Sequence, residues 1–229
     1  MIIHGILGIY LWWTPDCFLW LFEMDRHTLT RITFEGDSHS PQWSADGLSV
    51  LAGIESSTIR ALYRVAIDGA SAPEKLWSAE GPVYPYRGPA DGSVLPLDEE
   101  ANPQNHDIWV LPMSPEGKAE PFLHSTFNER TPMFSPDGKW IAYRSNESGR
   151  DEVYIRAYPS RGQRTQISMD GGSDPLWSRD GKELFFVHEK ALYSVSIATE
   201  PSLIISAPRK ILDSDFVSSR ALNYDVSLD

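Results

Sequence analysis

Residues 131–140, TPMFSPDGKW, consist of two short apolar runs that meet at Asp137-Gly138. An Asp-Gly pair is typical of a tight connection between antiparallel strands, because glycine adopts the positive φ angle that such a turn requires. Taken alone, the stretch predicts a hairpin. What it says about the whole fold depends on whether it recurs.

The stretch recurs as a template of proline, any residue, Trp or Phe, Ser, any residue, Asp and Gly. Complete copies occupy residues 41–47, 132–138 and 175–181, Asp91-Gly92 keeps only the turn dipeptide, and residues 224–229 begin a copy that stops before its glycine. We expect these turns to be structural, because Ser and Asp oxygens accept turn N–H groups while Gly takes the positive φ. The turn residues are Ser44, Asp46, Gly47, Asp91, Gly92, Ser135, Asp137, Gly138, Ser178, Asp180 and Gly181.

A second marker, an aromatic residue between aliphatic ones, runs in step with the template. It occurs at Trp20, Tyr63, Trp109, Tyr154 and Tyr193, and each copy is followed by another short aliphatic run. Each unit of about 45 residues is therefore predicted to hold four short strands, which is typical of the blades of an all-β propeller. Strands such as 140–143 and 184–187 are apolar on both faces, as a blade packed between two neighbours requires.

The number of blades stays open. Four whole repeats span about 39–221, with three strands before them and one after. If strand 222–227 pairs with 6–13, the ring closes with five blades through a shared blade, and no sheet edge is left exposed. Otherwise the chain is an open arc of a larger, six-bladed ring.

The first 17 residues are treated as a separate, uncertain segment, and 18–229 as the propeller, which ends within a repeat. Residues 1–22 are apolar enough to suggest a signal peptide or anchor, but Pro15 and Asp16 interrupt them and no Lys or Arg precedes them. We favour a blade strand here and expect no strong membrane span.

Composition narrows the classes of partner. The chain has 229 residues, of which 41% are hydrophobic, and a net charge of −12 from 20 basic and 32 acidic residues. No basic run exists to follow a phosphate backbone, so we expect no nucleic-acid binding. The single cysteine, Cys17, excludes an internal disulfide.

The search for catalytic and metal-binding motifs finds none. There is no Gly-x-Ser-x-Gly elbow, no glycine-rich phosphate loop and no His-Arg-Asp, so we expect no cofactor, no metal and no catalysis. The histidines are not at ligand spacing, and we expect them to be scattered over the surface. The acidic runs Asp98-Glu99-Glu100 and Asp151-Glu152 are expected to be solvated loop charges.

The template, followed by KWIAYRSN, ESGRDE and VYIRAY, resembles the TolB-like propeller repeat over residues 18–229. The same repeat occurs in propellers fused to bacterial Ser/Thr kinases and in the lids of prolyl-oligopeptidase-type peptidases. The resemblance implies a bacterial protein, in the periplasm or as an extension of a membrane kinase, although no clear signal peptide is present and the compartment stays open. The sequence departs from the family pattern at the repeat around Asp91-Gly92, at residues 1–17 and in blade number.

One fold serves unrelated functions, so two roles stay open. The favoured one is a non-catalytic module that binds or senses a protein or peptide, and the alternative is the regulatory lid of a serine peptidase whose catalytic domain is absent here. We expect the partner to meet the loops that lead into the first strand of each blade, with Arg130 and His39 as the main contacts. The candidate residues of this partner face are His39, Asn128, Glu129, Arg130, Ser173 and Asp174.

Overall fold

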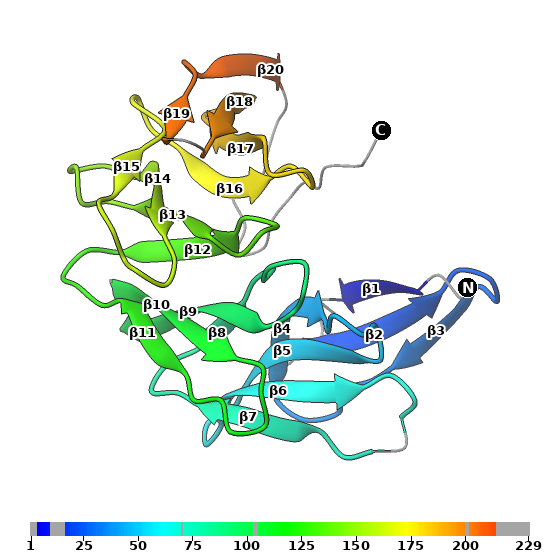
Figure 1. Cartoon of the computed structure of the whole chain (residues 1–229). Helices are drawn as coiled ribbons and strands as arrows, with labels where there is room; N and C mark the ends of the chain where they lie inside the picture. The colour runs from blue at the N-terminus through cyan, green and yellow to red at the C-terminus, as the bar shows by residue number, and fades with distance from the viewer. Residues whose placement is uncertain (1–3, 10–16, 70, 103–104, 200–201, 214–229) are drawn as a thin grey trace. The chain divides into compact units, whose positions relative to one another are not determined.

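A computed structural model describes residues 4–9, 17–69, 71–102, 105–199 and 202–213. Within these ranges the chain is all-β and forms five sheets, each made of consecutive strands (Figure 1). No helix that could span a membrane occurs in the described ranges. The predicted fold class, an all-β chain of four-stranded propeller blades, is confirmed.

The sheets follow one another in chain order, and their strands are as follows. The first sheet contains β1 (His4–Ile9), β2 (Phe18–Glu23) and β3 (Thr28–Arg31). The second contains β4 (Asp37–Trp43), β5 (Ser49–Glu55), β6 (Arg60–Ala66) and β7 (Glu74–Ser78), and the third β8 (Val83–Pro85), β9 (Val94–Asn102), β10 (Asn105–Pro112) and β11 (Glu120–Leu123). The fourth contains β12 (Glu129–Phe134), β13 (Trp140–Ser145), β14 (Glu152–Ala157) and β15 (Thr165–Gln166). The fifth contains β16 (Ser173–Trp177), β17 (Glu183–His188), β18 (Ala191–Ala198), β19 (Ile204–Ile205) and β20 (Arg209–Asp213).

The repeat markers occupy equivalent strands. Each complete template ends the first strand of its sheet and turns into the second, while the aromatic marker lies in the third strand, as Tyr154 does in β14. Tyr143 of β13 lies directly across from Tyr154, with the two rings stacked 5.8 Å apart. The fifth sheet adds one pairing that the pattern did not predict, because both β19 and β20 pair with β18.

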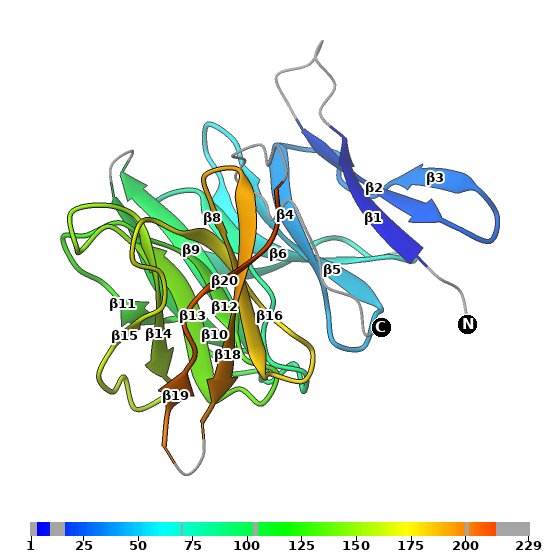
Figure 2. The ribbon, with the colours of Figure 1, turned by 90° about the horizontal axis from the view of Figure 1, so that it is seen from above.

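The chain divides into two compact units, Met1–Pro85 with Glu99–Asn102, and Tyr86–Asp98 with Pro103–Asp229. In the first unit, Leu19 and Ile32 pack against Val50 and Ala52 of the next sheet. In the second unit, Ile108 and Phe122 pack against residues of β12 to β14, and β16 in turn contacts β12, β13 and β14 (Figure 2). Burial of apolar side chains between successive sheets is thus the main stabilising term in each unit.

A bulge interrupts the first strand of the three sheets that carry the complete template. Ser40, Thr131 and Asp174 each precede the template proline and have positive φ angles of 51°, 51° and 52°. The pairing register shifts at the same places, between His39 and Gln42, between Arg130 and Met133, and between Ser173 and Leu176. Positive φ is uncommon outside glycine and costs free energy. Because the same bulge occurs in three sheets, it is a regular part of the repeat.

The structure corrects several expectations about polar residues. Asp98 and Glu99 are buried in β9, with exposed fractions of 2% and 4%, because β9 extends to Asn102 through the supposed loop. His106 is also buried, and Glu152 begins β14 as a buried residue. The candidate-face residues His39, Glu129, Arg130, Ser173 and Asp174 lie within first strands rather than in the loops before them.

At the N-terminus, β1 pairs antiparallel with β2 and places Leu7 opposite Trp20. The expected strand 6–13 corresponds to β1 as far as Ile9, and its remaining residues lie outside the described ranges. The proposed closing strand 222–227 also lies outside them.

Candidate functional site

The complete template turns share one hydrogen-bond pattern. In the turn after β12, the Ser135 hydroxyl donates to Asp137 Oδ1 (2.6 Å), and the Asp137 carboxylate accepts the Lys139 amide (3.1 Å). Gly138 has φ of 72°, and its amide donates to the Ser135 carbonyl (2.9 Å). The turns at Ser44, Asp46 and Gly47 and at Ser178, Asp180 and Gly181 repeat these bonds.

The incomplete copy forms its turn differently. Asp91 accepts the Ser93 amide (2.9 Å) and Gly92 has φ of 65°, but the Gly92 amide donates to the carbonyl of Pro89, which stands where the other copies have serine. The flanking segment instead pairs with the next sheet, because the Phe134 amide donates to the Arg87 carbonyl and the Ala90 amide to the Pro136 carbonyl.

Hydrogen bonds stabilise the charged form of three turn carboxylates, those of Asp46, Asp91 and Asp180. The Ser44 hydroxyl lowers the pKa of Asp46, and the backbone amides of Ser93 and Lys182 lower the pKa of Asp91 and Asp180. Asp137 and Asp180 also line a cavity of about 710 Å³ with Trp140 and Trp177.

The residues expected to form one partner face have different environments. In the first unit, His39 lies half-buried with its ring 4.6 Å from that of Tyr84. In the second unit, Arg130 Nε donates to Asn128 Oδ1 (2.9 Å) at the start of β12, and Ser173 donates to Asp174 (3.0 Å) at the start of β16. Glu129 is only 4% exposed. In the second unit, the partner face therefore consists of Arg130 and of Ser173 and Asp174 at the start of β16.

Two further residues join this face, and sequence reasoning missed both. Arg144 of β13 lies directly opposite Arg130 of β12, and its guanidinium pairs with the carboxylate of Asp151. Arg144 also acts on Asp174, whose pKa is raised by burial and partly lowered again by this cation. We call Arg130, Arg144, Asp151 and Asp174 the polar cluster.

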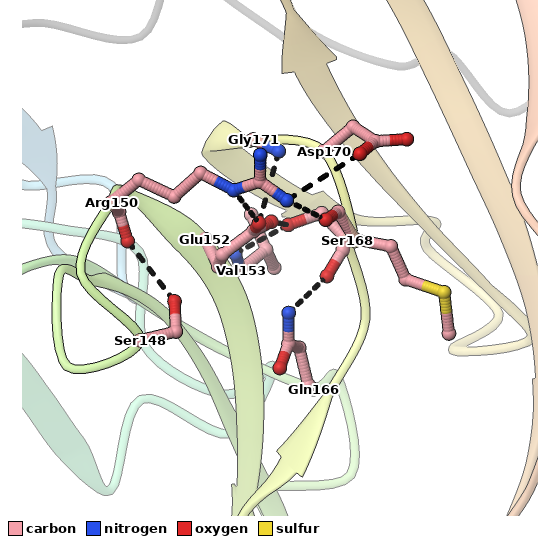
Figure 3. A network of polar contacts seen from close by, with 9 residues as sticks. Ser148, Arg150, Glu152, Val153, Gln166, Ser168, Asp170 and Gly171 are labelled. Carbon is pink, nitrogen blue, oxygen red and sulfur yellow. Dashed lines mark hydrogen bonds and ion pairs between the residues drawn. The ribbon is translucent and has the colours of Figure 1, made fainter.

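A network around Glu152 holds the segment that leads into β16 (Figure 3). The buried Glu152 carboxylate accepts the Arg150 side chain (2.8 Å), the Gly171 amide (3.0 Å) and the Ser168 hydroxyl. Arg150 reaches the Met169 carbonyl as well. A Cβ at Gly172 would lie 2.6 Å from the Ser168 hydroxyl oxygen, so this close approach requires glycine. The network thereby positions Ser173 and Asp174.

The preceding sheet has an acid–base pair of side chains at equivalent positions. Asp98 bonds the ring of His106, and its second oxygen accepts the Thr131 amide at the bulge of β12 (3.3 Å). Asp98 and Arg144 each stand six residues after a turn glycine. At the same position the other two copies have Gly53 and Val187. The residue type at this position therefore differs between repeats, and that difference is the sequence signal that could have revealed the site.

Within the part of the chain that the structure describes, no group of three His, Cys, Asp or Glu side chains is placed to hold a metal ion. The geometry of the polar cluster is one of paired charges on a rigid sheet edge. Its groups can bind a charged surface through charge-assisted hydrogen bonds.

No family model matches the chain. No curated protein resembles its sequence significantly.

Comparison with solved structures identifies the fold. The chain is similar to TolB from Acinetobacter baumannii with a TM-score of 0.63 and 17% identity, over 88% of this chain and 52% of that protein. It is similar to a putative TolB from Agrobacterium tumefaciens with a TM-score of 0.66 and 15% identity, over 93% and 90% of the two chains. It is also similar to a puromycin-hydrolyzing peptidase of Mycobacterium tuberculosis with a TM-score of 0.63 and 15% identity, over 87% of this chain and 37% of that one.

The resemblance to TolB-like propellers is therefore confirmed as a likeness of fold. The chain spans about half the length of the Acinetobacter protein and most of the Agrobacterium one. Because similar folds include a peptidase as well as TolB, the fold does not determine an activity.

Proposed function

We propose that this chain is a non-catalytic propeller that binds a protein or peptide partner through the polar cluster. The observation that carries the proposal is the pair Arg130 and Arg144, which face each other across β12 and β13. Like charges directly opposite one another destabilise a sheet. Asp151 offsets part of that cost by pairing with Arg144. An acidic group of a partner that binds beside Arg130 would offset the remainder.

The backbone beneath the cluster supports the same role. Thr131 and Asp174 adopt positive φ at the bulges next to Arg130 and Ser173. The same bulge occurs at Ser40, so it belongs to the repeat, and in the second unit it orients the backbone that carries Arg130 and Ser173. The Glu152 network fixes the neighbouring segment, so the partner meets a preformed surface and little ordering is needed on binding.

Two settings fit such a module. It can be the C-terminal part of a bacterial Ser/Thr kinase, or the regulatory lid of a prolyl-oligopeptidase-type peptidase. The chain is similar to a puromycin-hydrolyzing peptidase and spans 37% of it. This similarity supports the peptidase lid as an alternative setting. A kinase domain or a Gly-x-Ser-x-Gly domain in the adjoining reading frame distinguishes the two.

The test is capture of the partner by the immobilised chain from cells that express it, with quantitative mass spectrometry. We expect Arg130→Glu to abolish capture of a protein that the wild type enriches, because the acidic group then meets a like charge. His39→Ala tests whether His39, which the sequence analysis assigned to the partner face, contributes to capture. Arg64→Glu, which reverses a half-buried arginine of the first unit that pairs with Glu74, is the control and retains capture. Unchanged capture by Arg130→Glu would remove the proposal.

A further inference from the structure

A cavity of about 430 Å³ lies in the second unit, outside the polar cluster. It opens between β11 and the face of the fourth sheet that carries Tyr143. Its apolar wall consists of Phe122, Phe127 and the Tyr143 ring. The volume is in the range of pockets that hold small molecules, and a mostly apolar wall with a few polar groups is typical of them.

The cavity also contains both signs of charge. Arg156, Arg161 and Arg164 line it, together with Glu129 and Glu147. Two of the arginines are engaged, since Arg161 donates to the Pro121 carbonyl (2.5 Å) and Arg164 pairs with Glu147 Oε2 (2.7 Å). Arg156 has no such bond to any residue in the described ranges.

Three buried polar atoms of the wall have no hydrogen-bond partner among the described residues. They are Glu129 Oε2, Glu147 Oε1 and Arg156 Nε. Glu129 is 4% exposed, and only its other oxygen is bonded, by the Ser125 hydroxyl (2.5 Å). Native proteins pair most buried polar atoms with protein groups or ordered water, so two acceptors and one donor in one cavity are available to a ligand that enters it.

We propose that this cavity binds a small zwitterion, an α-amino acid or a short peptide, whose ammonium group lies between Glu129 and Glu147 and whose carboxylate meets Arg156. The ligand's side chain packs against the aromatic wall formed by Phe122, Phe127 and Tyr143. The cavity residues differ from those of the polar cluster, so the ligand-binding proposal and the partner-binding proposal can fail independently.

A ligand with a single charge fits less well. A simple anion would satisfy Arg156 but would leave the two carboxylate oxygens unpaired and bring a like charge beside them. A simple cation would leave Arg156 Nε unpaired. Only a ligand that carries a donor and an acceptor satisfies all three atoms at once.

The electrostatics of Glu129 agree with an ammonium ligand. Burial, with the nearby carboxylates of Asp107 and Glu147, raises the pKa of Glu129 to about 7, although the Ser125 hydroxyl and Arg156 act to lower it. An ammonium group beside this carboxylate would favour its charged form. Binding should therefore release protons near neutral pH.

The first experiment uses wild-type chain and needs no mutation. The twenty amino acids are screened by thermal shift, and phenylalanine, its amide, its N-acetyl derivative and the dipeptide Ala-Phe are titrated by calorimetry. We expect an amino acid or the dipeptide to bind, and removal of either charge to weaken binding at least about tenfold, since each charge loses its buried partner. Tighter binding of the dipeptide than of the free amino acid would identify short peptides as the ligand class.

Matched variants complete the test. Glu129→Gln and Arg156→Gln should each weaken binding about tenfold, while Arg64→Gln in the other unit leaves it unchanged, with folding of each checked by circular dichroism. Binding of no zwitterion at millimolar concentration, equal binding of the amide and acetyl derivatives, or binding of inorganic phosphate in their place would overturn the proposal. If Glu129→Gln does not fold, binding to Arg156→Gln and the titration of the wild-type chain with the ligand series test the proposal.

Discussion

The third and fourth sheets place an acid–base pair of side chains at the same two repeat positions, with the acid and the base exchanged. Six residues after the turn glycine stands Asp98 in one and Arg144 in the other, and three residues before the marker aromatic stand His106 and Asp151. In both sheets the two positions bond each other. The second and fifth sheets have Gly53 with Arg60 and Val187 with Lys190, which are not acid–base pairs.

The two pairs differ in burial. The Asp98 and His106 side chains are 3% and 6% exposed, whereas those of Arg144 and Asp151 are 26% and 39% exposed. Removing one side chain of a buried pair leaves the other side chain buried without its bonding group. Water screens the interaction in an exposed pair, so the same change there costs less. One repeat template therefore supplies a pair that fixes the fold in one sheet and a pair that is accessible for binding in the next.

The largest expected effect is that of Asp98→Ala. We expect a loss of about 3 kcal/mol in the free energy of unfolding, because His106 and the Thr131 amide lose a buried acceptor. Denaturant unfolding measures it, with an unchanged slope as the check that the folded state is intact. A loss below about 1 kcal/mol would mean that the buried pair does not fix the fold.

Gly138→Val tests how the turn of the fourth sheet packs on the third. We expect a cost of about 1–3 kcal/mol, because the φ of 72° is unfavourable for valine and the added Cβ would lie 3.2 Å from Pro89 Cβ. Gly47→Val is the control, since Gly47 has φ of 68° but no atom within 4 Å of an added Cβ. Equal costs for the two variants would show that contact with Pro89 contributes nothing.

The pH dependence of stability tests Glu129, the buried carboxyl at the start of β12. Its pKa is raised from 4.5 to about 7, so the folded chain binds a proton that the unfolded chain has lost between these values. The free energy of unfolding should therefore fall as pH rises from about 4.5 to 7 and gain no further slope from this group above 7. Glu129→Gln should flatten that part of the profile, and an identical profile in the variant would contradict the assignment.

The smallest expected effect is that of Asp151→Ala. Because Arg144 and Asp151 are partly exposed, we expect a loss of about 1 kcal/mol or less in the free energy of unfolding. The same denaturant titration serves, run beside Asp98→Ala. A cost as large as that of Asp98→Ala would erase the contrast between the two sheets.

The regular part of the fold could be predicted from the sequence because it repeats. The turn at Asp137-Gly138 and the aromatic at Tyr154 mark strands through local chemistry, namely a positive φ and an apolar residue between packed sheets. The bulges escaped prediction, because a residue before proline is expected in the extended region, yet Thr131 has φ of 51°.

The polar residues were harder to place. Asp98 and Glu152 are typical of loops by composition, and only their partners, His106 and Thr131 for one and Ser168 with Gly171 for the other, make burial tolerable. Those partners are distant in sequence, so no local pattern reveals them. Arg130 was expected at the partner face because it lies just before the predicted first strand of its blade. A comparison of the repeats six residues after the turn glycine would have pointed to Arg144.

The most direct test of the contrast between the two sheets is partner capture by Arg144→Ala relative to wild type. The affinity for the captured partner should fall at least about tenfold, or about 1.4 kcal/mol, in a chain whose stability is nearly unchanged, because an accessible arginine at the centre of the polar cluster is lost. Capture at wild-type affinity by the folded variant would contradict the assignment of this exposed pair to binding.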